Sequence, residues 1–187
     1  MRRGFKAQAE RLADRAREAL GKSADAALEP REYARHLGVI ILDIAELDIS
    51  EGCRQQLFVV DSDSWSGMTL KEGDAVGIVI NSSHSHARQN STLAHELAHL
   101  VLNHQPVRVD VSPGGMLLLS EFSEDAEAEA DWLSAALLLP REALMARRRR
   151  GESVPMIAAA YGISTQLCEW RLRMTGVDLQ VKRSAAK

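Results

Sequence analysis

Two histidines and a glutamate in the middle of the chain have the types and spacing to bind a metal ion and move a proton. His95, Glu96 and His99 form an H-E-x-x-H pattern inside the helix-favouring segment 92–102. Residues four apart lie on one face of a helix, so both imidazoles can bind one Zn²⁺ at about 2.0–2.1 Å. Glu96 lies beside them and can reach a metal-bound water. A hydrolytic site would still need a third ligand and an open position.

The residues after His99 exclude one common source of that third ligand. In the extended H-E-x-x-H-x-x-G-x-x-H pattern, a glycine and a further histidine follow three and six residues after the second histidine. Here these positions hold Leu102 and Gln105, and His104 is one residue out of register. We therefore expect a carboxylate from a later helix to complete the site.

The segment 123–140 carries suitable carboxylates on a predicted helix. Ser123 is placed to cap its start and Pro140 to end it. Glu127 and Asp131 are four residues apart and share a face, so one can bind the metal while the other orients an imidazole. The spacing favours Glu127 as the ligand but does not decide between the two. The remaining acids are interpreted as a solvated helix start or as lying on another face: Glu121, Glu124, Asp125 and Glu129.

The paired segments resemble the ImmA/IrrE family of intracellular zinc metallopeptidases. The resemblance rests on Arg88–His99 and Glu127–Pro140, and it extends over roughly residues 30 to 175. The family pattern implies Glu127 as the third ligand, in agreement with the helical spacing. Ser91 and Ala98 depart from the family pattern but are not ligand positions, so they bear on the subfamily alone.

The resemblance implies one Zn²⁺ held by His95, His99 and Glu127, with Glu96 as the catalytic base. The expected activity is that of a zinc metalloendopeptidase. It also implies an α+β fold of the small zincin-like, gluzincin type. In that fold a few-stranded sheet packs on the H-E-x-x-H helix and the Glu-bearing helix, and a helical pair follows at the C-terminus.

The family also implies a class of substrate, namely an intracellular regulatory protein such as a helix-turn-helix repressor. We accordingly expect a protein partner and neither direct nucleic-acid binding nor membrane binding. Tyr161 and Arg88 are candidates for stabilising an oxyanion, although no pattern singles them out. The alternative from another class is a DNA-binding or adaptor protein whose zinc site is structural or inactive.

Composition is that of an ordinary globular chain. Its 187 residues are 45% hydrophobic and 26% charged, and the formal net charge of −3 gives no argument for nucleic-acid or membrane binding. Cys53 and Cys168 lack C-x-x-C spacing, so reduced thiols are expected. No secretory signal and no run of about 20 apolar residues is present, which predicts a cytoplasmic protein. Composition does not specify the oligomeric state.

The rest of the chain predicts the elements that position the site. Residues 1–139 are expected to form the peptidase core, with an N-terminal helix and strands before the metal helix, and 140–187 a helical extension packed on it. The strand at 76–80 is either a sheet edge that pairs with an extended substrate or a plain core strand. The predicted helices are 5–20, 30–38, 123–139 and 141–150, and the other predicted strands are 39–42 and 57–60. Residues 65–68 are expected to lie in a loop or a short strand.

The C-terminal extension contains a pattern similar to a helix-turn-helix at 157–172. A DNA reader exposes basic and polar side chains at the start of its second helix. Here that start offers Thr165, Gln166 and the acidic Glu169, so we interpret the pair as scaffold. The run 147–150 of four arginines is interpreted as a solvated helix end.

The other histidines receive no ligand role. His84 and His86 lie in a polar loop and are expected to be exposed, and His104 is expected to cap the metal helix.

Overall fold

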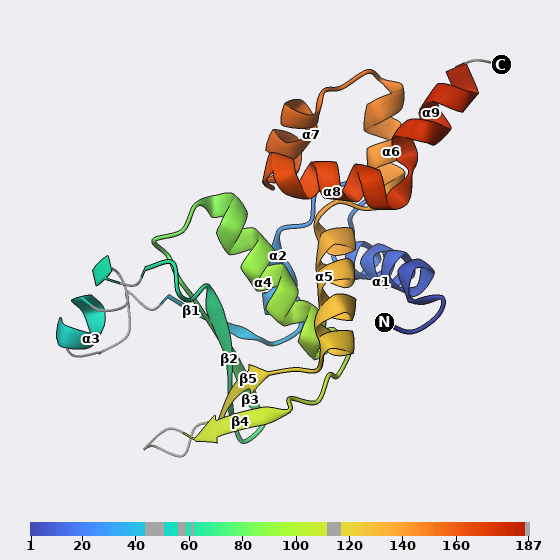
Figure 1. The fold of residues 1–187 in the computed structure, drawn as a ribbon. Coiled ribbons are helices and arrows are strands. Elements are labelled where there is room, and N and C mark those ends of the chain that lie inside the picture. Colours follow the sequence, from blue (N-terminus) through green and yellow to red (C-terminus); the bar gives the residue numbers. More distant parts are fainter. Residues whose placement is uncertain (44–50, 56–58, 61, 112–116, 186–187) are drawn as a thin grey trace.

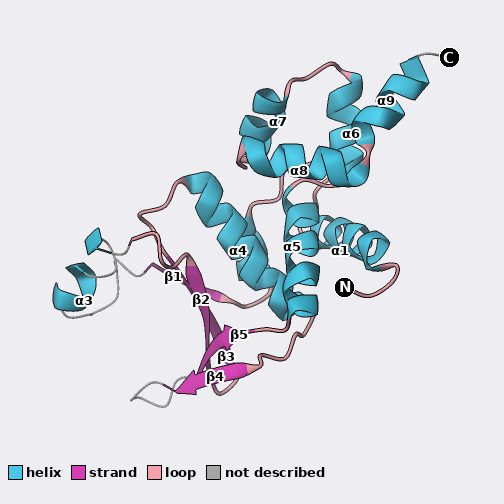
Figure 2. Cartoon of the chain, in the orientation of Figure 1, coloured by secondary structure: helices cyan, strands magenta, loops and turns pink. Residues whose placement is uncertain are grey.

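The computed structural model describes residues 1–43, 51–55, 59–60, 62–111 and 117–185 as an α+β protein. A mixed sheet lies at one end, and helices cover it and extend away from it (Figures 1 and 2). The strands are β1 (Ile40–Asp43), β2 (Gly67–Glu72), β3 (Ala75–Ile80), β4 (Arg108–Val111) and β5 (Leu117–Glu121). The helices are α1 (Phe5–Ala19), α2 (Pro30–His36), α3 (Glu51–Gln55), α4 (His86–Val101), α5 (Glu124–Leu138), α6 (Arg141–Arg149), α7 (Val154–Tyr161), α8 (Thr165–Thr175) and α9 (Val177–Ala185). No described helix is long and apolar enough to cross a membrane.

The sheet has the order β1-β3-β2-β5-β4, with β1 parallel to β3 and the other neighbours antiparallel. β3 therefore lies inside the sheet, bonded on both sides, and Ile78, Val79 and Ile80 are buried. The interpretation of 76–80 as a substrate-pairing edge is thus wrong, and the alternative of a core strand is confirmed. A run of apolar β-branched residues indicates a buried strand. A central strand fits this pattern because it is covered on both faces and bonded along both edges.

Other strands also differ from expectation. The run 39–42 does form β1, but as an edge strand whose Ile40 is 54% exposed. In the predicted strand 57–60, residues 57 and 58 lie outside the described residues, and Val59 and Val60 are exposed and belong to no strand. β4 and β5 were not predicted, and only the start of β2 overlaps the loop or short strand expected at 65–68; β2 and β4 carry charged residues.

The two helices of the predicted site begin where their capping residues stand. Ser85 Oγ accepts from Arg88 N at the start of α4, and Ser123 Oγ accepts from Ala126 N at the start of α5. Leu93 and Leu97 of α4 pack with Leu133 and Leu137 of α5 in one buried cluster. α4 thereby lies between the sheet and α5 (Figure 1), which brings the H-E-x-x-H face toward the first turns of α5.

The far end of α5 is held by two buried guanidinium groups. Arg17 Nη2 donates to Leu137 O at 2.6 Å, and Arg171 Nε donates to Leu139 O at 2.9 Å. The last carbonyls of a helix lack partners within the helix, and α5 has no basic residue in its own last turn. Arg17 and Arg171, on α1 and α8, therefore satisfy this helix end from outside. Burial lowers the pKa of Arg17 to about 10.

The C-terminal helices share a second buried cluster with the ends of α4 and α5. Ala94 and Leu138 pack there with Leu144, Ile157 and Cys168. Figure 1 shows α6–α9 gathered around the end of α5 that is distant from the sheet. The division at residues 139/140 itself stays a prediction.

Candidate metal centre

Three side chains from α4 and α5 converge on one point. His95 Nε2 lies 3.0 Å from His99 Nε2 and 3.1 Å from Glu127 Oε2, and His99 Nε2 lies 3.7 Å from the same oxygen. Ligands of a tetrahedral zinc ion would lie about 3.3 Å apart, given zinc–ligand bonds near 2.0–2.1 Å. Among the described residues this is the cluster of His, Cys, Asp or Glu side chains that could hold a metal ion. The structure therefore brings together the three predicted ligands, and the donor set fits zinc.

The imidazole of His95 is held on its other side by the second predicted acid. Its Nδ1 lies 3.1 Å from Asp131 Oδ1, so Asp131 orients the ring while Glu127 faces the metal position. Burial acts to lower the pKa of His95. The hydrogen bond with Asp131 and the charges of Asp131, Glu96 and Glu127 together outweigh burial, so the net effect is a raised pKa. A bound cation would reverse this by competing with the proton for Nε2.

His99 has a contrasting environment. Its side chain is 3% exposed, and burial together with the neighbouring histidines lowers its pKa to about 3. A metal ligand must be neutral imidazole, so His99 is already in its binding form at neutral pH. Phe122 stacks on the ring with the centroids 3.8 Å apart, which fixes the plane of the imidazole.

Glu96 points from α4 toward the sheet, where it meets a residue that the sequence did not single out. Thr69 of β2 is buried, and its Oγ1 donates to Glu96 Oε2 at 2.6 Å. Burial raises the pKa of Glu96, while this hydrogen bond and His95 act in the opposite direction. Thr69 thus fixes one carboxylate oxygen of Glu96. The Glu96 carboxylate lies beside the three converging side chains of the candidate metal centre. The loop or short strand expected at 65–68 ends before Thr69, so no sequence signal pointed to this residue.

A glycine allows β2 to approach the metal helix closely. A Cβ atom at Gly67 would lie 2.6 Å from Thr92 Cγ2 and 3.1 Å from Val79 O. β5 pairs with β2 only from Thr69 to Lys71. Among the described residues, Gly67 and Met68 therefore have no strand partner on that side, next to Glu96. β2 is an inner strand of the sheet, but within the described strands its first two residues pair with β3 alone.

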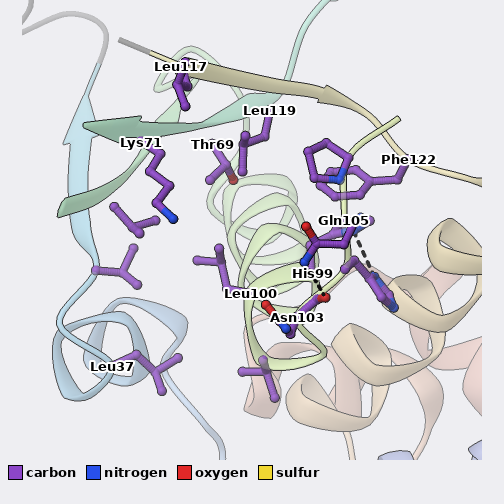
Figure 3. Close-up of a pocket in the computed structure, with 15 residues that line it drawn as sticks. Leu37, Thr69, Lys71, His99, Leu100, Asn103, Gln105, Leu117, Leu119 and Phe122 are labelled. Carbon is purple, nitrogen blue, oxygen red and sulfur yellow. Dashed lines mark hydrogen bonds between the residues drawn. The ribbon is translucent and has the colours of Figure 1, made fainter. Parts of the chain in front are cut away.

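His95 and His99 each border a cavity. A cavity of about 500 Å³ lies between β2, β5 and the C-terminal end of α4 and reaches His99 (Figure 3). Its walls are mostly apolar, with Leu100, Leu117 and Leu119 among them, and Lys71 extends into it. A smaller cavity of about 280 Å³ borders His95 and Asp131 and is closed by Leu167 and Trp170 of α8.

The two candidate oxyanion donors have other partners. Arg88 donates to Asp63 Oδ1 at 2.7 Å and to Ser66 Oγ at 3.1 Å, and Tyr161 Oη donates to the backbone oxygen of Asp25 at 2.5 Å. These hydrogen bonds hold both side chains against loops. The structure therefore does not bring Arg88 and Tyr161 together with the three converging side chains.

The remaining histidines differ in part from expectation. The side chain of His84 is only 5% exposed, because its Nε2 lies 3.1 Å from Ser62 O, so its predicted exposure is wrong. His86 is exposed as predicted. At the end of α4 it is the backbone N–H of His104 that bonds His99 O, whereas the imidazole of His104 lies against the ring of His99.

The fold and site define an α+β protein with a candidate His–His–Glu metal centre on two packed helices. Comparison with protein families gives the more particular assignment: the model of the IrrE N-terminal-like domain, peptidase family M78, matches residues 62–173. The chain belongs to this family, and the ImmA/IrrE resemblance is confirmed. No curated protein and no solved structure gave a match.

Proposed function

We propose that this protein is a zinc-dependent metalloendopeptidase with a gluzincin-type site. The observation that carries the proposal is the convergence of His95, His99 and Glu127, with Glu96 fixed beside them by Thr69. Zinc bound there would polarise a peptide carbonyl and lower the pKa of a bound water toward about 7.

The side chains divide the remaining work among them. Glu96 would accept a proton from the attacking water and return it to the leaving amine, a role that typically contributes about 10²–10⁴-fold to the rate. Thr69 holds Oε2 of Glu96, which leaves Oε1 for the proton transfer. Asp131 keeps the ring of His95 turned toward the site.

The first two residues of β2, which among the described strands pair with β3 alone, support a polypeptide as substrate. An extended segment could pair with Gly67 and Met68 through backbone hydrogen bonds and so pass in front of Glu96. The apolar cavities beside His99 and His95 offer space for its side chains. We propose a regulatory protein, a helix-turn-helix repressor, as the physiological substrate; this finer assignment rests on the family.

Substitution at Glu96 tests the proposal most directly. The Glu96→Gln variant should retain about one zinc per chain but produce none of the new protein N-termini that wild type generates when both are expressed in the same host. The His95→Ala and Glu127→Ala variants should lose both zinc and cleavage. Cleavage that persists in Glu96→Gln would refute the catalytic role.

The alternative of a DNA-binding protein receives no support from the helical pair. Arg171 is fully buried and bonds Leu139 O and Glu10, so it is not available to a phosphate. The exposed start of α8 carries Thr165, Gln166 and Glu169, none of which is basic. A gel-shift titration with duplex DNA should show no binding at physiological salt.

A further inference from the structure

His99 has a partner on the side opposite the metal position. Its Nε2 faces His95 and Glu127, so its Nδ1 points away, and there it lies 3.1 Å from Nδ1 of His104. His104 is only 10% exposed. This contact links the metal helix to the chain just beyond its end.

The proton positions in this contact follow from metal binding. A ligating Nε2 needs its lone pair, so the proton of neutral His99 must sit on Nδ1. Nδ1 of His99 then donates, and Nδ1 of His104 must accept. His104 is thereby left with its own proton on Nε2.

That second proton points toward a buried carboxylate. Nε2 of His104 is buried, has no partner within hydrogen-bond distance, and lies 3.6 Å from Glu129 Oε2. The side chain of Glu129 is 5% exposed. Arg2 holds it through Nε at 2.9 Å from Oε1 and Nη2 at 2.6 Å from Oε2, and the Arg2 backbone N–H also donates to Oε1. Glu129 is thus fixed as a negative charge near Nε2 of His104.

We propose that His104, backed by Glu129 and Arg2, is a positioning residue that fixes the tautomer and orientation of His99 as a metal ligand. The inference rests on the metal site of the proposed function but not on its catalytic step. The two imidazoles are then held differently: His95 directly by an exposed carboxylate, and His99 through a second imidazole and a buried carboxylate that Arg2 holds.

Two substitutions of similar size separate hydrogen bonding from packing. His104→Asn retains an acceptor oxygen near the place of Nδ1, whereas His104→Leu removes it. Zinc affinity, measured by competition with a fluorescent chelator, should fall by about 10–100-fold in His104→Leu and stay near wild type in His104→Asn. Arg2→Ala should cause a smaller loss, and Arg3→Ala, at an exposed neighbouring position, should cause none.

A spectroscopic readout distinguishes positioning from general stability. In zinc-free protein, the ¹⁵N chemical shifts of His99 should report the Nδ1–H tautomer in wild type and His104→Asn, and a mixture in His104→Leu. Thermal unfolding checks that each variant is folded.

The outcomes separate this inference from the proposed function. Equal zinc affinity in wild type and His104→Leu overturns the inference, as does an equal loss in the Asn and Leu variants. A wild-type protein that binds zinc but cleaves nothing overturns the peptidase assignment and leaves this inference standing. A wild-type protein that binds no zinc overturns both.

Discussion

The two ends of α5 differ in their surroundings. At the N-terminal end, Glu127 and Asp131 face the histidines with side chains 44% and 67% exposed. At the C-terminal end, Arg17 and Arg171 are fully buried against the last carbonyls. The proposed peptidase site would need access for water and substrate, and the open carboxylates allow it. The far end holds α1, α5 and α8 together through two buried guanidinium groups, which bond Leu137 O, Leu139 O and Glu10.

This contrast is tested first by exchanging the ligand carboxylate. Glu127→Gln should abolish stoichiometric zinc binding, because a neutral amide is a far poorer zinc ligand than a carboxylate. The metal-free variant should unfold at nearly the wild-type temperature, because Glu127 is half-exposed and contributes little to packing. Elemental analysis and calorimetry measure the two properties. A large drop in the melting temperature of metal-free protein would break the proposed division between the two ends.

The opposite result is expected at the other end of the helix. Arg171→Leu leaves Leu139 O without its partner and Glu10 without its ion pair, so the free energy of unfolding should fall by about 3–5 kcal/mol. Zinc affinity of the folded fraction should not change. Arg173→Leu, at an exposed position on the same helix, is the control and should stay within about 0.5 kcal/mol of wild type in urea denaturation.

A smaller effect is expected from the carboxylate that orients His95. Asp131→Ala removes the partner of Nδ1 and should weaken zinc binding by about 10–100-fold without removing it. Glu124→Ala, in the exposed first turn of α5, is the matched control and should retain wild-type affinity. If the two variants bind zinc equally well in a chelator competition, Asp131 has no orienting role.

The buried region around α8 should also show in the pH dependence of stability. Burial raises the pKa of Cys168 from 9.0 to about 11, so the folded protein retains the thiol proton where the unfolded chain loses it. Stability from this group is complete below pH 9 and is lost as the pH rises through about 11, by roughly 1–3 kcal/mol. In urea titrations, the free energy of unfolding should fall more between pH 8 and pH 11 for wild type than for Cys168→Ala. An equal fall in the two proteins would contradict this prediction.

The smallest expected effect lies at the cap of α5. Ser123→Ala removes the acceptor for Ala126 N and should cost about 1 kcal/mol. Because the cap lies on the metal side of the helix, zinc should restore part of the lost stability. Thermal unfolding with and without zinc tests this, and an identical loss in both conditions would show that the cap and the site are not coupled.

Much of the site was predictable because its signals are local. His95, Glu96 and His99 are positioned by the helical repeat, and Ser123 and Pro140 bound α5 through hydrogen bonding and ring geometry. Choosing between Glu127 and Asp131 required the family pattern, because spacing puts both on one face. Thr69 was missed because β2, with its lysine and glutamate, does not look like a strand beside a buried site.

The sequence by itself determined the helix that carries the metal pair, the helix that carries its carboxylates, and the family to which the chain belongs. Only the tertiary structure decided that β3 is internal and that β5 leaves the first two residues of β2 without a partner on its side, since strand order depends on pairing between distant segments. It also decided which groups surround the donors, because Arg2, Thr69, His104 and Glu129 meet only after the chain has folded. Spacing within a helix is fixed by the backbone, whereas contacts between elements depend on packing that no local pattern encodes.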